Sequence, residues 1–491
     1  MKNLKVFILA LLSLGSVYAQ ENNADKALSV ATSLEDMYSW NLYPSYQTYL
    51  DFMQHYADTY PNFCKLDTIG YSVQNRLLLV LKISSNPDSN LNQPKFFYSS
   101  TIHGNELTGA MILMHLIDTL LTSNSQDIVS MRNSMQMYIC PIANPDGTYH
   151  GGNNNVSNAT RYNANYIDLN RNFPDFKQGA HPDGESYQPE TMAFMEYALT
   201  ERFNMGSNLH TGSEVYNYPF DAYRSAQKTH ADKSWFEVMG HEFVNNFDAC
   251  TPNNYFKDVT TSGLIDGGDW YTVYGGRQDW HTYYAHCREV TLELSMSYTP
   301  SNATIANYWN YLHNSMLVLP RYCFIGFEGI VKDSLTNLPI EDVMIEILNH
   351  DRDSSEVFSN SNGYFLRPIL SGNYSVRFSK DGYFSKTIEV NTNEDLTDLG
   401  DILMVNQNFC DESVEQTRLR IYPNPIRDLL TIEVEQEFTG VILSLDGRIL
   451  KTFKLHKGAN VLDVSTISSG NYLLKVFNET KRYNEKISVI K

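Results

Sequence analysis

The segment from Ser100 to Glu106 carries two side chains that can bind a metal ion. His103 and Glu106 stand three residues apart, where a predicted strand ends and a predicted helix begins. Imidazole and carboxylate groups are both good zinc ligands, and two ligands with this spacing can converge across such a turn. The spacing alone is common in proteins, so it is weak evidence for a metal site until a third ligand is found.

The third candidate ligand is His210, which lies at the apparent end of a strand within residues 207–213. A His in this setting is more often a hydrogen-bonded structural residue. A catalytic zinc site, however, needs a third protein ligand and an open position, and His210 would complete such a set. Five other His residues have no comparable context and are interpreted as structural or surface residues: His115, His230, His241, His281 and His286.

Two further segments carry charged side chains in settings that suit catalysis. The pair Asn170-Arg171, within residues 166–175, offers an amide beside a planar cation and suits bidentate capture of a carboxylate. The alternative is a loop Arg in a surface ion pair. Glu293 stands inside a strand-like run, residues 289–295, where a charge is costly unless it has a partner or a task.

These clusters agree in chain order with one known family. They resemble the zinc carboxypeptidases of the funnelin type through eight residues: His103, Glu106, Arg161, Asn170, Arg171, His210, Tyr271 and Glu293. The segments 144–147, 168–175 and 275–279 are similar to its regulatory branch, the carboxypeptidase N/E/D group. The resemblance covers roughly residues 37–322, and six separated motifs in the same order rarely arise by chance.

The resemblance implies a mixed central sheet flanked by helices and a role for each residue of the site. It implies that His103, Glu106 and His210 bind one zinc ion per chain, which would activate a water molecule and polarise the scissile carbonyl. It further implies that Glu293 is the general base and that Arg161 stabilises the developing oxyanion.

The resemblance also implies an exopeptidase. Asn170 and Arg171 match the residues that bind the terminal carboxylate of the substrate, and Tyr271 matches the residue that closes over it. An internal peptide bond has no such carboxylate and would leave Arg171 unsatisfied, which is the physical basis of exopeptidase specificity. We therefore expect a zinc metallocarboxypeptidase whose substrates are peptides or proteins with a free C-terminus.

Asp221 and Gln278 bear on the residue that is removed. The segment 210–221 matches the regulatory branch without a gap, and in that branch an Asp at this place lies at the bottom of the pocket for the departing residue. Gln278 also matches the branch. The resemblance therefore implies a preference for C-terminal Lys or Arg, because an apolar end would leave a partly desolvated Asp unpaired. The alternative is that Asp221 caps a turn after Pro219 and faces solvent.

The six cysteines contain no CxxC pair, which argues against a thiolate zinc site. Cys250 and Cys287 stand in places similar to those of cysteines in the regulatory branch. The resemblance therefore implies a disulfide between them that braces the loop of Tyr271. The alternative is two buried thiols.

Residues 1–19 are predicted to be a secretory signal peptide. Lys2 and Lys5 precede a short apolar run, which ends in a small-residue cleavage signal at Ala19. Residues 20–36 form a segment of unassigned role. Strand-like and helix-like runs alternate in residues 37–322, which is typical of an α/β fold.

The rest of the chain is predicted to form two small all-β sandwiches, residues 323–405 and 416–491, joined by a polar linker, residues 406–415. The first resembles the transthyretin-like domain of the regulatory branch. The second resembles the C-terminal sorting domain of type IX secretion, and its alternative is an adhesive β-domain. The expected protein is secreted, or held at the cell surface, by a Gram-negative bacterium whose secretion machinery binds this last domain.

The charge of the chain disfavours some partners. Its 37 Lys and Arg residues and 56 Asp and Glu residues give a formal net charge of −19, which suits neither nucleic acid nor an anionic membrane surface. No segment after the signal peptide is long and apolar enough to span a bilayer.

Two alternative functions remain open at this stage. One is a zinc amidase or deacylase that acts on a non-standard substrate such as cell-wall peptides, although Asn170, Arg171 and Tyr271 argue against it. The other is a catalytically inactive surface-binding protein, against which the complete ligand set and Glu293 argue.

Overall fold

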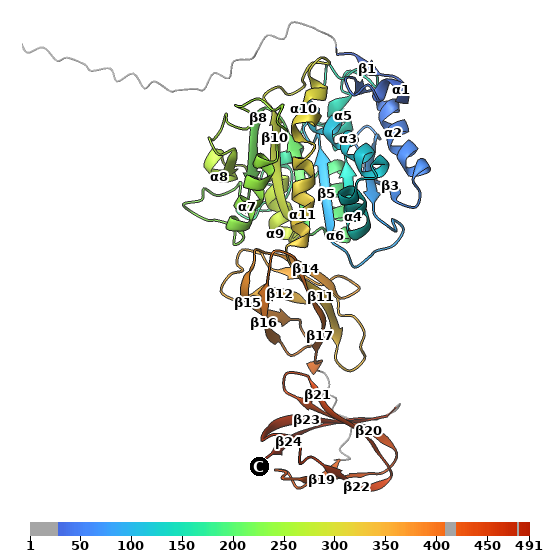
Figure 1. The fold of residues 1–491 in the computed structure, drawn as a ribbon, viewed down its shortest axis with the longest axis vertical. Helices are drawn as coiled ribbons and strands as arrows, with labels where there is room; N and C mark the ends of the chain where they lie inside the picture. Colours follow the sequence, from blue (N-terminus) through green and yellow to red (C-terminus); the bar gives the residue numbers. More distant parts are fainter. Residues whose placement is uncertain (1–27, 408–418, 479–480) are drawn as a thin grey trace, which may run out of the picture.

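The computed structural model describes residues 28–407, 419–478 and 481–491. They form three bodies that follow one another along the molecule: an α/β body, then two β bodies, drawn from blue to yellow, in orange and in red in Figure 1. The predicted signal peptide, Cys410 and most of the predicted linker lie outside the described residues.

A mixed eight-stranded sheet forms the centre of the α/β body, in the order β3-β4-β6-β5-β7-β10-β8-β9. In chain order its strands are β3 (Cys64–Tyr71), β4 (Leu77–Ile83), β5 (Lys95–Ser100), β6 (Gln136–Cys140), β7 (Met205–His210), β8 (Ser213–Tyr218), β9 (Leu264–Asp266) and β10 (Arg288–Ser295). The four neighbours β6, β5, β7 and β10 run parallel. All their residues are buried, as expected of parallel strands covered on both faces.

Helices cover the two faces of the sheet. One face packs into a single apolar core with α2 (Tyr46–Thr59), α3 (Thr108–Thr122), α4 (Gln126–Ser134), α7 (Lys233–Asn245), α10 (Ile305–Leu312) and α11 (Val318–Arg321). The other face packs against α6 (Pro189–Glu201) and α9 (Arg277–Tyr284). The two cores take alternate residues of β5, such as Phe96 and Phe97, because successive side chains of a strand point to opposite faces.

Short elements complete this body: β1 (Val30–Ala31), α1 (Leu34–Met37), β2 (Tyr43–Pro44), α5 (Pro145–Thr148), η1 (Leu169–Arg171), α8 (Gly267–Trp270), η2 (Ser315–Leu317) and η3 (Tyr322–Phe324). Residues 28–36, which had no assigned role, pack against the body; the backbone of Ser29 exchanges hydrogen bonds of 2.8 and 3.0 Å with the side chain of Asn302. The expected α/β fold is confirmed, including the helix after β5, which begins at Thr108.

Each β body consists of two small sheets that enclose an apolar core. The first contains β11 (Gly326–Asp333), β12 (Met344–Ile347), β13 (Val357–Phe358), β14 (Tyr364–Pro368), β15 (Gly372–Ser379), β16 (Lys386–Thr392) and β17 (Leu396–Met404). The second contains β18 (Arg420–Tyr422), β19 (Leu429–Val434), β20 (Phe438–Ser444), β21 (Ile449–Leu455), β22 (Gly458–Asp463), β23 (Gly470–Phe477) and β24 (Arg482–Val489). Asp446 and Gly447 form the turn of the β20–β21 hairpin.

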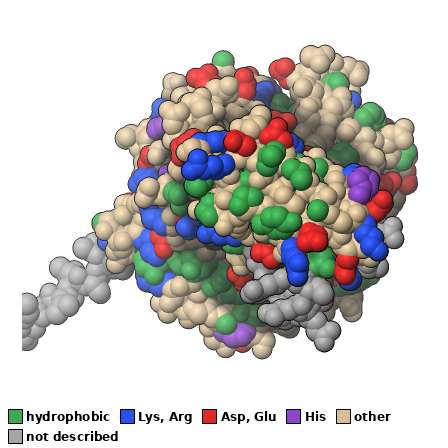
Figure 2. Space-filling model, turned by 90° about the horizontal axis from the view of Figure 1, so that it is seen from below, with side chains coloured by type: hydrophobic (Ala, Val, Ile, Leu, Met, Phe, Trp, Pro, Cys, Tyr) green, Lys and Arg blue, Asp and Glu red, His purple; other side chains and the backbone are tan. Residues whose placement is uncertain are grey.

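The last β body carries apolar side chains on its surface. Seen from this end of the molecule, green apolar side chains lie among acidic and basic ones (Figure 2). The large apolar side chains exposed on this body are Tyr422, Leu429, Leu445, Ile449, Val461 and Ile490. Among the described residues, none of the helices combines the length and the apolar character needed to cross a bilayer.

The expected disulfide between Cys250 and Cys287 is wrong, because both thiols are free. Cys250 is exposed in the turn that follows α7, whereas Cys287 is buried directly before β10. Burial raises the pKa of the Cys287 thiol well above its ordinary value. The two side chains therefore occupy different environments. The loop of Tyr271 makes backbone hydrogen bonds instead, from Tyr271 to Gly267 at 3.2 Å and from Gly268 to Phe220 at 2.8 Å.

Candidate metal centre and substrate site

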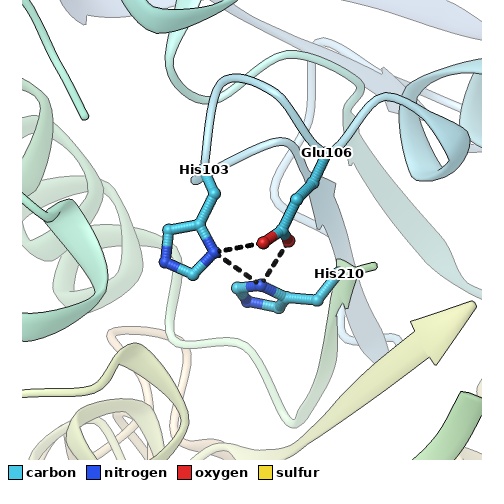
Figure 3. Close-up of side chains that lie close together, drawn as sticks. All are labelled: His103, Glu106 and His210. Atoms are coloured by element: carbon cyan, nitrogen blue, oxygen red, sulfur yellow. Dashed lines mark hydrogen bonds and ion pairs between the residues drawn. The ribbon is translucent and has the colours of Figure 1, made fainter. Parts of the chain in front are cut away.

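His103, Glu106 and His210 converge as the sequence predicts (Figure 3). Nδ1 of His103 lies 2.7 Å from Oε1 of Glu106, and Nδ1 of His210 lies 2.8 Å from Oε2 of the same carboxylate. The two Nδ1 atoms are 3.2 Å apart. All three side chains are buried, so each presents a donor atom to one small central space.

The sheet explains why residues so far apart in sequence meet. His103 follows β5, His210 ends β7, and these two strands are parallel neighbours. The ends of parallel strands lie at the same edge of a sheet, which is where α/β proteins place their ligand sites. Residues 101–107 form the turn that leads into α3 and carries Glu106 back toward His103.

Each imidazole has a polar partner on its outer nitrogen. Nε2 of His103 lies 3.1 Å from Oδ1 of Asp168, and Nε2 of His210 lies 2.7 Å from the side-chain amide of Asn208. Such partners orient metal-binding imidazoles and keep Nδ1 available to a metal. Two imidazoles and one carboxylate, buried and convergent, form a donor set that fits zinc and leaves room for a water ligand.

Arg161 borders this centre. Its NH1 atom lies 3.1 Å from Nδ1 of His103, and its Nε donates a 2.9 Å hydrogen bond to Asp168. Burial alone would raise the pKa of Asp168, but the hydrogen bond with His103 and the charge of Arg161 hold it well below its ordinary value. An ionised Asp168 thus fixes both a predicted ligand and the predicted oxyanion-binding Arg.

Glu293 stands on β10 directly beside His210, its register partner on β7. Burial raises the pKa of Glu293 well above its ordinary value, and the negative charge of Glu106 raises it further. A carboxylate that is difficult to ionise is a better proton acceptor than an exposed one once it is charged. The position next to the donor set therefore suits a general base.

The residues predicted to bind the terminal carboxylate are linked to the metal centre through Asp168, whose Oδ1 accepts the backbone N–H of Asn170 at 3.0 Å and lies 3.1 Å from Nε2 of His103. Asn170 and Arg171 belong to η1, and Oδ1 of Asn170 accepts a 2.8 Å hydrogen bond from the backbone of Arg277. Tyr271 follows α8 and is 47% exposed, so solvent reaches its side chain at the rim of the site. Burial raises the pKa of Tyr271, and negative Glu293 adds to this effect while Arg171 opposes it.

Asp221 is buried and does not face solvent as a turn cap would. Its Oδ1 accepts hydrogen bonds of 3.1 Å from the amides of both Asn217 and Gln278. A Cβ atom at Gly276 would stand 3.8 Å from both Asp221 Oδ2 and Asn170 Oδ1, so the two side chains border the same space. This arrangement brings a buried carboxylate next to the residues expected to hold the end of the substrate.

Sequence reasoning missed several residues that support the site. The sequence places Asp168 in the segment 168–175 and Asn208 two residues before His210, but it indicates no role for either. Asp279 received no role, yet its carboxylate accepts the backbone N–H groups of Asp221 and Ala222 at 2.9 and 2.8 Å. Each of these residues lies near a candidate residue in the sequence. Nearness in the sequence, however, does not show which side chains from different strands and helices contact each other.

Three family models match separate parts of the chain. The zinc carboxypeptidase model matches residues 49–315, which is more than half of the chain. The chain belongs to the zinc carboxypeptidase family. Residues 326–404 of this zinc carboxypeptidase match a carboxypeptidase regulatory-like domain, and residues 420–491 match a secretion system C-terminal sorting domain. These matches confirm the predicted family, and the sorting domain indicates export by type IX secretion.

Curated relatives support the regulatory branch. Carboxypeptidase D of Anas platyrhynchos is 33% identical over 359 residues, covering 70% of this chain and 25% of that protein. Carboxypeptidase M of Mus musculus is 32% identical over 348 residues, covering 68% of this chain and 77% of that protein. Carboxypeptidase N catalytic chain of Rattus norvegicus is 30% identical over 370 residues, covering 67% of this chain and 79% of that protein. The chain thus spans about a quarter of the length of the carboxypeptidase D relatives.

Solved structures include carboxypeptidase A from Helicoverpa armigera, which aligns with 57% of this chain and 74% of its own at 19% identity and a TM-score of 0.48.

Proposed function

We propose that this zinc carboxypeptidase hydrolyses the last peptide bond of peptides and proteins and prefers a C-terminal Lys or Arg. The observation that carries the proposal is the buried carboxylate of Asp221, which borders the same space as Asn170. A cationic side chain would pair with this carboxylate, whereas an apolar side chain would leave it desolvated and unpaired. Gln278 donates to the same carboxylate and holds it in place.

Two groups select the end of the chain in this proposal. Asn170 and Arg171 bind the terminal carboxylate through an amide N–H and the guanidinium fork. Tyr271, half-exposed at the rim, closes over the bound residue. A substrate without a free C-terminus leaves Arg171 unpaired, so cleavage is limited to the last bond.

The chemical step is assigned to the residues around the donor set. Zinc bound by His103, Glu106 and His210 would supply a Lewis acid that activates water and polarises the carbonyl. Glu293 accepts the proton of the attacking water and delivers it to the leaving amine. Arg161, which reaches His103 through its NH1 atom, donates to the developing oxyanion.

The site of action is assigned from the two ends of the chain. The predicted signal peptide would direct the chain out of the cytoplasm, and the sorting domain would direct it across the outer membrane. We assign the mature enzyme to the medium or the cell surface of a Gram-negative bacterium, where it meets peptides with free C-termini.

The test is a digest of peptides that differ only in their last residue, which is Arg, Lys, Phe, Leu or Glu. Release of a single residue, fastest from the Arg and Lys peptides and abolished by a chelator until zinc is restored, is the expected result. Faster release of Phe or Leu would refute the basic preference. Activity in a preparation that contains no bound zinc would refute the metal assignment.

A further inference from the structure

A chain of buried polar residues leads away from the metal centre behind His210. Asn208 and His210 stand two residues apart on β7, so their side chains point to the same face of the sheet. The amide of Asn208 lies 2.7 Å from Nε2 of His210, on the side of the ring opposite the donor atom Nδ1. Asn208 is therefore the only partner that the structure records for this nitrogen within the described residues.

The orientation of Asn208 is fixed from the neighbouring strand. Ser99 on β5 is its register partner, and the Ser99 hydroxyl lies 3.1 Å from Oδ1 of Asn208. The guanidinium of Arg277 hydrogen-bonds to the same hydroxyl through NH1. Arg277 is itself held by Glu289, 3.0 Å from its NH2 atom, and all four of these residues are buried.

We call the chain of Asn208, Ser99 and Arg277 the relay. It ends in a second buried cluster. Nδ1 of His281 lies 2.8 Å from Oε2 of Glu289, the same oxygen that faces Arg277. This cluster joins α9, which carries Arg277 and His281, to β10, which carries Glu289 and Glu293. Arg277 and Glu289 carry opposite charges, so each compensates the buried charge of the other and the cluster holds a fixed geometry.

A zinc ligand needs its proton on the other ring nitrogen. If Nδ1 of His210 binds the metal, Nε2 carries hydrogen and requires an acceptor. The amide of Asn208 can supply Oδ1 as this acceptor by a half-turn, with its NH2 group then donating to the Ser99 hydroxyl oxygen. An apolar side chain of the same size could not, and would leave a buried N–H unsatisfied.

We infer that Asn208 is the positioning residue of the zinc ligand His210, and that Ser99 and Arg277 hold its amide in place. The relay fixes the tautomer and the ring orientation of His210, just as Asp168 does for His103. It also connects the ligand on β7 to the helix and strand that carry Gln278 and Glu293. The inference rests on the proposed zinc site and adds residues to it that do not touch substrate.

The test measures the zinc dissociation constant of the full chain by competition with a coloured chelator. Asn208→Leu is expected to raise it about 10- to 100-fold, the usual cost of removing an outer partner of a metal ligand. Asn208→Asp keeps an acceptor for Nε2–H and is expected to retain zinc affinity. Ser99→Ala, which frees the amide, is expected to give an intermediate loss.

Ser207→Ala is the matched control for Ser99→Ala. Ser207 is a buried serine on β7 whose side chain points away from the face that carries Asn208 and His210. It should leave the zinc constant unchanged, and circular dichroism should show a native fold for every variant compared.

The outcomes separate this inference from the function. Unchanged zinc affinity in Asn208→Leu would overturn the relay while leaving the carboxypeptidase intact. Equal losses in Asn208→Asp and Asn208→Leu would also overturn it, because they would show a packing effect and not a need for an acceptor. Failure of the unmodified chain to bind zinc would refute the proposed function and the relay together.

Discussion

Two buried carboxylates with different surroundings are assigned to different tasks in this site. Glu106 contacts both imidazoles, and these contacts lower the pKa of its carboxyl even though burial opposes them. Among the residues that the structure describes, no imidazole hydrogen-bonds to the carboxylate of Glu293, and burial raises its pKa. A ligand must stay ionised, whereas a base must be able to accept a proton, so the two environments match the two assigned roles.

The assigned role of Glu293 predicts a specific loss. Glu293→Gln should bind zinc and substrate as the unmodified chain does but lose turnover by about 10²- to 10⁴-fold, because an amide cannot accept the proton. Zinc content, KM and kcat measured on the same preparation check this. Glu196→Gln, an exposed change on α6, is the control and should leave all three unchanged. Near-normal turnover in Glu293→Gln would show that another group is the base.

The raised pKa of Asp221 predicts that the substrate preference depends on pH. Burial raises the pKa of Asp221 to about 6, although the hydrogen bond of Asn217 and the charge of Arg171 oppose the shift. Below this pH the carboxyl becomes neutral and loses its attraction for a cationic side chain. The KM for peptides that end in Lys or Arg should therefore rise as the pH falls through about 6, whereas the KM for a Leu-ended peptide should not follow the same curve.

Besides Asn217, the groups near Asp221 are Asp279 and Gln278 on α9 and Arg171 on η1. The control for this experiment is therefore a change of Asp221 itself, which leaves these groups in place. Asp221→Asn should remove the difference between the two pH curves, because the amide does not titrate, and should reduce the preference for basic ends at least about tenfold. A basic preference that survives Asp221→Asn unchanged would assign the pocket to another residue.

At the scale of elements, α9 holds the floor of the pocket. Asp279 accepts two backbone N–H groups from the segment that contains Asp221. Asp279→Ala should leave these buried groups unsatisfied, at a cost of about 1–3 kcal/mol for each, and should raise the KM for basic peptides. Urea unfolding and steady-state kinetics measure the two effects. Unaltered stability together with unaltered KM would mean that the segment holds its shape without α9.

The elements were more predictable than their contacts. The strand ending before His103, the helix after Glu106 and the strand around Glu293 follow from local apolar patterns, because burial on a sheet or helix face leaves a period in the sequence. The order of strands in the sheet leaves no such period. Partners such as Asn208 for His210 depend on that order, and sequence reasoning therefore missed their role.

The prediction of a disulfide between Cys250 and Cys287 was wrong for a related reason. Similar positions in the chain placed Cys250 and Cys287 together, but pairing requires side chains that face each other at short range. Cys250 is exposed and Cys287, directly before β10, is buried. Burial of one partner is decided by the packing of the whole body, which the positions of two cysteines do not specify.

At the scale of the whole molecule, a buried ionic cluster joins the α/β body to the first β body. Asp232 precedes α7 and accepts hydrogen bonds from Arg288 of its own body at 3.0 and 3.1 Å. Arg367 of β14 donates to the two oxygens of Asp232 at 2.9 and 3.0 Å, and His350 lies 2.8 Å from Oδ1. Asp232, Arg288 and Arg367 are buried, so water does not screen these contacts.

This cluster predicts that the first β body stabilises the catalytic body. Arg367→Met removes one cation and leaves Asp232 buried and less compensated, which should cost about 3–5 kcal/mol in the free energy of unfolding. Arg202→Met is the matched control. It breaks the ion pairs of Arg202 with Glu341 and Asp342 and a hydrogen bond to the backbone of Ser359, between the same two bodies, but the three charged side chains are all more than a third exposed. An exposed pair of this kind contributes at most about 1 kcal/mol. Equal losses in the two variants would contradict a special role for the buried cluster.

The same cluster fixes how the loss should depend on pH. Burial alone would raise the pKa of Asp232, but Arg367 and Arg288 hold it well below the ordinary value of 3.8. A group whose pKa is lower in the folded state stabilises the fold above its unfolded pKa, and the contribution disappears as the pH falls through the folded value. The difference in unfolding free energy between the unmodified chain and Arg367→Met should therefore be constant near neutral pH and shrink below about pH 4. Urea unfolding at a series of pH values measures it. A difference that stays constant down to acidic pH would show that Arg367 acts through packing and not through the charge of Asp232.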